Sequence, residues 1–234
     1  MTSDQTNQLL RRLDRFDTRG DAAAALLRSD VQLAGPPPPA LLSGIALGEA
    51  RLHQPLLDLA RAWSRPEMSR AALDAFHAAE AARERQELAW LLKTVLAVEH
   101  SPEVIARVHD DTEDMQVRRW LVEGLERLAC GGALGWDELG VVVDTLAGEG
   151  SSSLREALAS LLMTLPWRRE NERLLATMLR DPDPIVVAAA AHTLAGYPDA
   201  VRDLDTRLLQ YLRQHQNPLI NQAVGELDAA LKRE

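Results

Sequence analysis

The sequence contains few cysteine, lysine and aromatic residues, and these shortages exclude several kinds of structure and site. One of its 234 residues is cysteine, Cys130, so it can form neither an intramolecular disulfide nor a zinc site of several thiolates. Aromatic residues make up 4%, and few apolar stretches are rich in β-branched residues, which disfavours sheets. No apolar run approaches the roughly 18 residues that a membrane span requires, so we expect no membrane contact.

The net charge and the first residues indicate which partners and which cellular location to expect. The formal net charge is −9 at pH 7, and of the 26 cations only Lys93 and Lys232 are not Arg, as in GC-rich bacterial genomes. An acidic balance argues against any function that needs broad contact with phosphate groups, so a nucleic-acid partner is not expected. A local basic groove is still compatible with this net charge. Residues 1–5 lack the basic and apolar stretches of a secretory signal, which predicts a cytoplasmic protein.

One spacing of apolar residues recurs in the second half of the chain. Apolar residues stand at positions 0, +4 and +8 in four groups: Val117, Leu121 and Leu125; Leu154, Leu158 and Leu162; Val186, Ala190 and Leu194; Leu219, Ala223 and Leu227. The first members of successive groups are 37, 32 and 33 residues apart. This period is typical of stacked helical repeats, in which each repeat buries a helix face against its neighbour. The spacing therefore predicts an all-α repeat protein.

Proline and glycine positions predict where the helices begin and end. Paired helices are expected over 136–147, 170–180 and 201–214 (first helices) and 114–129, 152–165, 184–196 and 218–232 (second helices). Before them, helices are expected over 7–17, 21–29, 40–52, 55–63, 66–82, 84–98 and 102–109. Asp21, Asp183 and Asn217 are candidate N-caps, and Gly131-Gly132 should end a helix.

The same proline and glycine positions indicate how the chain is divided. The run Gly35 to Pro39 should be a stiff connector, with recognition by a proline-binding module as the alternative. No low-complexity linker divides the chain. We therefore expect one domain over 1–234, with irregular helices over 1–65 and repeats over 66–234.

The stretch 181–194, Asp-Pro-Asp-Pro-Ile-Val-Val-Ala-Ala-Ala-Ala-His-Thr-Leu, resembles the second helix of a short bacterial HEAT repeat. That family's Val-Arg pair is matched at Val117-Arg118 and Leu154-Arg155 and lost at Val187 and Ile220. The resemblance covers 110–232, is weak before about 66, and implies a HEAT-like right-handed α-α superhelix of about five to six helix pairs. Phycobilin-lyase-type subunits share such repeats, so an accessory role in cofactor attachment stays open. Tetratricopeptide repeats have a similar period, but their signature is not in register here.

The sequence contains no pattern of a catalytic or metal site. His109-Asp110 is a His-Asp doublet of the kind that can ligate metals, but the other histidines show no matching spacing, and a polar helix end explains it. Residues 131–135 lack the Lys and Ser/Thr of a phosphate loop. Cys130 is expected to be a buried small apolar residue rather than a reactive thiol. We predict no catalytic residue, no metal ligand and no cofactor.

A row of Arg residues is the candidate binding site. Arg70, Arg118, Arg119 and Arg155 occupy similar positions in successive second helices, and Trp120 lies beside them. On a concave face, such a row would suit an acidic peptide or a phosphate.

The same row has a structural interpretation. Each Arg could instead pair with an acid of the adjacent repeat, such as Glu123 or Glu156, and hold the stack together.

The functional prediction is a non-enzymatic scaffold or adaptor that binds a protein partner, of unknown identity, on its concave face. The alternative is an alkylpurine DNA glycosylase, because some of these enzymes resemble the chain as HEAT-like stacks of similar length. Their Trp, Asp and Arg cannot be placed on particular positions here, so that alternative rests on fold analogy.

Overall fold

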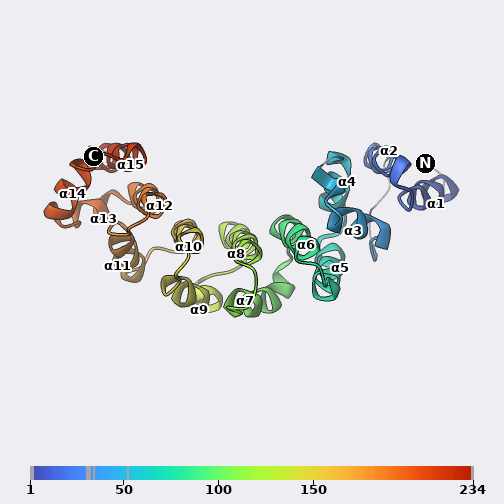
Figure 1. The fold of residues 1–234 in the computed structure, drawn as a ribbon, viewed down its shortest axis with the longest axis horizontal. Coiled ribbons are helices and arrows are strands. Elements are labelled where there is room, and N and C mark those ends of the chain that lie inside the picture. The colour runs from blue at the N-terminus through green and yellow to red at the C-terminus, as the bar shows by residue number, and fades with distance from the viewer. Residues whose placement is uncertain (1–2, 30–32, 34, 52, 233–234) are drawn as a thin grey trace. The chain divides into compact units, whose positions relative to one another are not determined.

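The computed structural model describes residues 3–29, 33, 35–51 and 53–232, and every regular element in these ranges is a helix. The chain divides into two compact units, Met1–Leu128 and Ala129–Glu234. Within each unit, short helices are joined by tight turns (Figure 1). The predicted all-α helical repeat fold is confirmed, whereas a single domain over 1–234 stays a prediction.

The described part of the first unit consists of helices that pack pairwise, α2 on α4, α5 on α6 and α3 on α6. These helices are α1 (Ser3–Arg12), α2 (Phe16–Leu27), α3 (Pro39–Ala46), α4 (Gln54–Ala62), α5 (Arg65–Ala78), α6 (Ala82–Val95), α7 (Ser101–His109) and α8 (Met115–Cys130), of which α8 belongs to this unit up to Leu128. Short 3₁₀ turns, Glu49–Arg51 and Val98–His100, precede α4 and α7. The fully buried core includes Leu26, Leu56, Met68, Leu73, Phe76 and Leu91.

The first two helices begin earlier than the sequence predicts. Asp21 was expected to cap a helix over 21–29, but it lies inside α2, which begins at Phe16. The buried side chain of Arg19 explains the shift: its Nε donates to the carbonyl oxygen of Leu13 at 2.6 Å and its Nη1 to Glu49 at 2.5 Å. These bonds stabilise the helical turn that precedes Asp21.

The proline-rich connector between α2 and α3 is fixed by a tryptophan. The indole Nε1 of Trp63 donates to the carbonyl oxygen of Gly35 at 2.8 Å, and Gly35 has a φ of +76°. Pro37 is buried, and Pro39 begins α3. These contacts fit the predicted connector; recognition of Pro36–Pro39 by another protein stays a prediction.

Ion pairs join residues about one repeat apart in the first unit. They are Arg19–Glu49, Arg51–Glu87, Arg70–Glu103 and Arg85–Glu113. Opposite charges at this spacing link each repeat to the next, beside the apolar contacts that supply most of the stacking energy.

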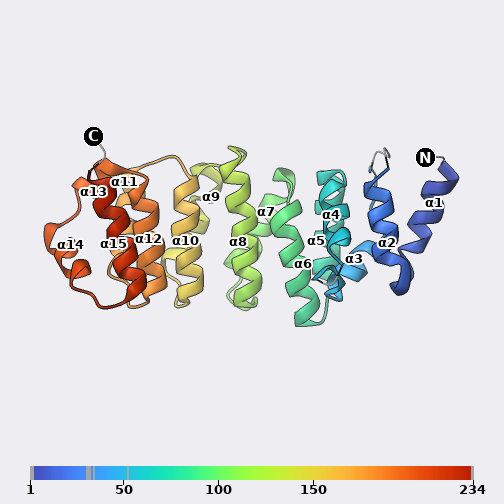
Figure 2. The same cartoon turned by 90° about the horizontal axis from the view of Figure 1, so that it is seen from above.

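The second unit has two layers of helices. Its elements are α9 (Trp136–Ala147), α10 (Ser152–Thr164), α11 (Arg169–Met178), α12 (Pro184–Ala195), α13 (Pro198–Arg202), α14 (Thr206–Arg213) and α15 (Pro218–Ala230). The second helices α10, α12 and α15 lie side by side (Figure 2), and α9, α11 and α14 pack behind them. Gly132, with a φ of +71°, follows the end of α8, as the glycine pair predicts.

Capping residues determine how the helices of the second unit begin. Asp183 and Asn217 accept hydrogen bonds from the backbone N–H groups of Ile185 and Leu219, which confirms both as N-caps. The helix predicted over 201–214 is instead two helices, α13 and α14. Asp205 explains the break, because its side chain caps α14 by accepting from the N–H of Arg207.

One position of the buried line predicted for the last repeat is wrong, whereas Ala223 and Leu227 are buried as predicted, at 3% and 0% exposure. Leu219 was placed in the buried line, but it is 46% exposed, and Ile220 is buried in its place at 3% exposure. Ile220 is the third residue of α15, as Val186 is the third residue of α12. The reason is that Pro218 begins α15, and the helix start determines which of two adjacent apolar residues points inward.

Candidate functional site: a groove across α10, α12 and α15

The predicted Arg row is engaged in contacts within the protein. Arg118 is 5% exposed and its Nε donates to the carbonyl oxygen of Val108 at 2.9 Å. Arg119 donates to Glu123 on its own helix at 3.2 Å. Trp120, next to them on α8, is half-buried.

Arg70 makes contacts of the same kind on α5. Its guanidinium binds Asp74 on its own helix and Glu103 in the next repeat, with its Nη1 2.6 Å from Glu103. These bonds, the one to Glu103 first, raise the pKa of Arg70, and the pKa of Glu103 is lowered by its bond to Arg70. Both groups therefore stay charged and paired.

Arg155 lies in the second unit and binds Asp181 of the next repeat with two hydrogen bonds. The structure thus joins Arg118, Arg119 and Trp120 only as neighbours on α8, and it ties each described Arg of the row to groups of this chain. These contacts fit the structural interpretation of the row; a binding role for it stays a prediction.

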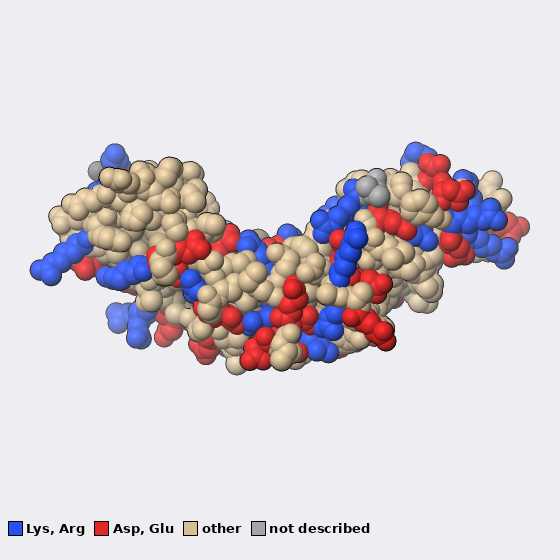
Figure 3. All heavy atoms as spheres, viewed as in Figure 1, with Lys and Arg blue, Asp and Glu red and all other residues tan. Residues whose placement is uncertain are grey.

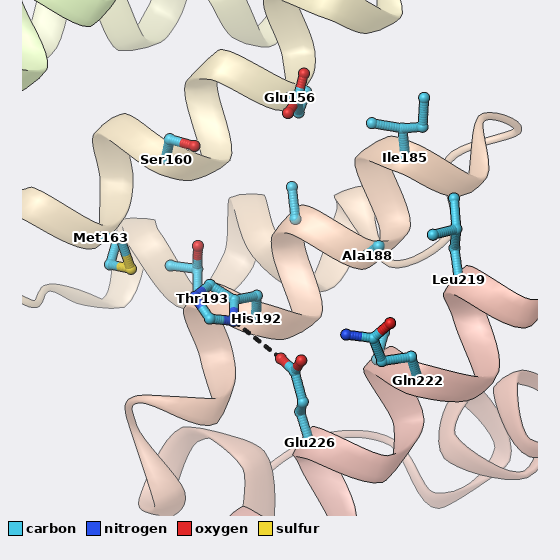
Figure 4. A pocket seen from close by; sticks show the side chains of 12 residues that line it. Glu156, Ser160, Met163, Ile185, Ala188, His192, Thr193, Leu219, Gln222 and Glu226 are labelled. Atoms are coloured by element: carbon cyan, nitrogen blue, oxygen red, sulfur yellow. Dashed lines mark hydrogen bonds and ion pairs between the residues drawn. The ribbon is translucent and has the colours of Figure 1, made fainter.

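A groove runs across the exposed faces of α10, α12 and α15 (Figure 4). It encloses about 400 Å³ and is lined by Glu156, Ser160, Met163, Ile185, Ala188, Ala189, His192, Thr193, Leu219, Gln222, Ala223 and Glu226. A second hollow shares four of these residues, among them Met163 and Gln222, and continues past Gly196, Gly225 and Ala229. Together the two hollows form one continuous surface, called the groove below.

The groove exists because each second helix has apolar residues on two sides. Val186 and Ile220 point into the core, while their neighbours Ile185 and Leu219 remain 49% and 46% exposed at the groove. Ala188 and Ala189 form a low floor between them. Small residues in the middle and large apolar residues at the ends leave a hollow that the chain does not fill.

The carboxylates of the groove are not matched by any Lys or Arg in its lining. Glu156 and Glu226 contribute carboxylates, and the Nδ1 atom of His192 lies 2.9 Å from Glu226 (Figure 4). The hydroxyl of Thr193 donates to the carbonyl oxygen of Ala159 at 3.0 Å, so it is used within the core. No Lys or Arg is among the lining residues.

Sequence reasoning missed this groove, although a signal was present. The dipeptides Ile185-Val186 and Leu219-Ile220 place two large apolar residues together at a helix start. Adjacent side chains of a helix point in different directions, and in each pair the second residue is buried while the first stays exposed at the groove. The 0, +4, +8 spacing describes the buried side of these helices and says nothing about the other side.

The predictions about other chemical groups have mixed outcomes. Asp110 accepts bonds from the hydroxyl and the N–H of Thr112, which lower the pKa of Asp110 and fit the interpretation of a polar helix end. Cys130 was expected to be buried and is exposed, because it lies at the last residue of α8. Among the described residues, no group of three or more His, Cys, Asp or Glu side chains is arranged to hold a metal ion.

Comparisons with known proteins support only general statements. No protein family matches the chain. No curated protein matches it either. Among solved structures it is similar to the designed armadillo repeat protein YIII(Dq)4CqI, at 13% identity and a TM-score of 0.49, over 96% of this chain and 98% of that one. In the described part of the chain no helix has both the length and the apolar character to cross a membrane.

Proposed function

We propose that the chain is a non-enzymatic interaction module that binds a segment of a partner protein in the groove across α10, α12 and α15. The observation that carries the proposal is the exposure of Ile185, Leu219 and Met163, at 49%, 46% and 43%, along one hollow surface. Large apolar side chains left in water along a concavity are typical of protein interaction sites.

The charge over this part of the unit supports a protein partner. In the view of Figure 3 the surface over α12 and α15 is largely uncharged, Lys or Arg side chains lie below it beside α14, and charges of both signs cover α1 to α8. Apolar contact with a polar edge is the composition of protein interfaces.

The DNA glycosylase alternative needs cations that face phosphate groups. The groove instead presents Glu156 and Glu226, so phosphates would be repelled there. Nothing in the described residues favours this function over a protein-binding one. A base-release assay on alkylated DNA tests it, and we expect no released base.

The proposal can be tested by photo-crosslinking in the native host. A photoreactive residue replaces Gln222, which is exposed in the groove, or Val141, which is 56% exposed on α9. A partner in the groove should give a discrete crosslinked product from position 222 and none from position 141.

The same experiment contains a variant that removes the apolar contacts. Ile185→Ser combined with Leu219→Ser should abolish the crosslink from position 222, because the partner loses its apolar contacts. Both side chains are exposed, so their loss leaves the core intact. No product from position 222, or equal products from both positions, would overturn the proposal.

A further inference from the structure

We infer that the occupant of the groove is a cationic amphipathic α-helix of the partner, lying along α12 and α15. The inference rests on the proposed function and adds the conformation and the charge of the bound segment. Three features of the groove lead to it: its all-helical lining, the shape of its floor and the sign of its charged residues.

The first feature concerns the partner's backbone. An extended segment must find hydrogen-bond partners for its N–H and C=O groups when it is buried, whereas a helix satisfies them internally. The groove is lined by helices, whose own backbone groups are bonded internally, so it offers no strand edge to an extended segment. Apart from the ionisable Glu156, Glu226 and His192, its side chains offer hydroxyl or amide groups at Ser160, Thr193 and Gln222, and Thr193 already donates to Ala159. A segment with a self-satisfied backbone therefore fits best.

The second feature is the shape of the groove between α12 and α15. Ala188, Ala223 and Gly225 keep the floor low, so a partner helix can approach closely and place large apolar side chains there. The lining on α12 extends from Ile185 to Ala195, a rise of about 15 Å at 1.5 Å per residue. This length accommodates about three turns of a helix.

The third feature is charge. The ionisable side chains of the groove are Glu156, Glu226 and His192, and the chain as a whole has a formal net charge of −9. A partner helix with Lys or Arg beside its apolar face would place cations near these carboxylates. Such complementarity favours encounter and orientation.

The test uses the purified full-length chain and three fluorescent peptides of about 14 residues, which span about 21 Å as helices. The first is amphipathic, with Leu and Ala on one face and Lys beside it. The second has Glu in place of each Lys. The third keeps the Lys residues but has Pro at two central positions. Fluorescence anisotropy at low and high salt measures their affinities.

We expect the Lys peptide alone to bind, and to bind less tightly as salt rises. Glu226→Lys should weaken it by about fivefold to tenfold. The matched charge reversal Asp144→Lys, on the exposed side of α9, should leave the affinity nearly unchanged. Glu226 is at the surface, where its pair with a 66% exposed His192 contributes little to folding.

Two results would overturn the inference. Equal binding of the Lys and Glu peptides would remove the charge preference, and equal binding of the Pro-containing peptide would show that no helix is needed. If none of the peptides binds while position 222 still crosslinks to a partner, this inference fails and the proposed function stands. Absence of that crosslink refutes the proposed function itself.

Discussion

Arg155 and Asp181 form a two-bond ion pair between adjacent repeats, with Nε 2.7 Å from Oδ2 and Nη2 3.0 Å from Oδ1. The same guanidinium donates through Nη1 to the carbonyl oxygens of Glu149 and Gly150. The side chains of the pair are 18% and 8% exposed. One Arg thus joins its own inter-helix turn to the repeat that follows.

Asp181→Ala is expected to lower the free energy of unfolding by about 2–4 kcal/mol, because it leaves the guanidinium of Arg155 without its partner in a largely buried place. Arg155→Met should also destabilise the chain, and the double variant should lose less than the sum of both. Urea unfolding followed by circular dichroism measures each term. Asp199→Ala, at a carboxylate that is 97% exposed beside Arg202, should change little; strictly additive losses would show that Arg155 and Asp181 do not interact.

The pair also makes stability depend on pH. Burial raises the pKa of Asp181, but the hydrogen bonds from Arg155 and from the N–H of Asp183 outweigh it and hold the pKa below its ordinary value of 3.8. The folded state therefore binds the proton less tightly than the unfolded state, so the stabilisation is complete above pH 3.8 and is lost as the pH falls through the lowered pKa.

The side chain of Asp181→Asn does not ionise, so this variant lacks the pH-dependent contribution at every pH. The difference in stability between it and the wild-type chain should therefore shrink as the pH is lowered from about 7 to about 3. Urea titrations at several pH values measure that difference. A difference that stays constant over the range would contradict the lowered pKa.

The Arg row can be assigned a role with one double variant, Arg118→Glu with Arg155→Glu. The contacts described here predict a lower melting temperature, because Arg118 is 5% exposed and both guanidinium groups bind backbone carbonyls. If the row instead served as a binding surface, helicity and melting temperature would be unchanged while capture of the partner would be lost. Thermal unfolding and affinity capture of the partner from the native host, measured on the same protein, separate the two roles.

The sequence predicts the buried faces of the helices better than their exposed faces. Buried positions such as Leu158 and Leu194 recur with the helical period, so the stack and most helix bounds could be predicted. The first buried position of α15 could not, because Leu219 and Ile220 are equally apolar and the position of Pro218 decides between them. The groove was missed for a related reason: it lies on the side of the helices where no spacing recurs, and its depth depends on three helices at once.

Two glycines in second helices should respond differently to alanine. A Cβ on Gly124 of α8 would lie 3.3 Å from the Cα of Lys93 and 3.5 Å from the carbonyl oxygen of Leu92, both backbone atoms of α6. A Cβ on Gly225 of α15 would meet nothing within 4 Å. Gly225→Ala should therefore stabilise the chain by about 0.5–1 kcal/mol through helix propensity.

Gly124→Ala should lose that gain to crowding, and Gly124→Val should destabilise by about 1–3 kcal/mol. Melting temperatures of the three variants give the comparison. If Gly124→Ala stabilised the chain as much as Gly225→Ala does, the close approach of α6 and α8 would be refuted.

Leu219 and Ile220 offer the sharpest test of both the fold and the site, because they are adjacent and similar in size but only Ile220 is buried. Ile220→Ala should cost about 2–4 kcal/mol, because it removes three buried carbons and leaves a cavity next to α12. Leu219→Ala should leave the free energy of unfolding nearly unchanged, since the side chain is 46% exposed. It should nevertheless weaken the crosslink from position 222 and the affinity for the Lys peptide, because Leu219 lines the groove. Urea unfolding and anisotropy, measured on both variants, should therefore rank the effects of the two substitutions in opposite order. A larger stability loss for Leu219→Ala would restore the buried position that the sequence spacing predicts for Leu219 and remove this residue from the groove.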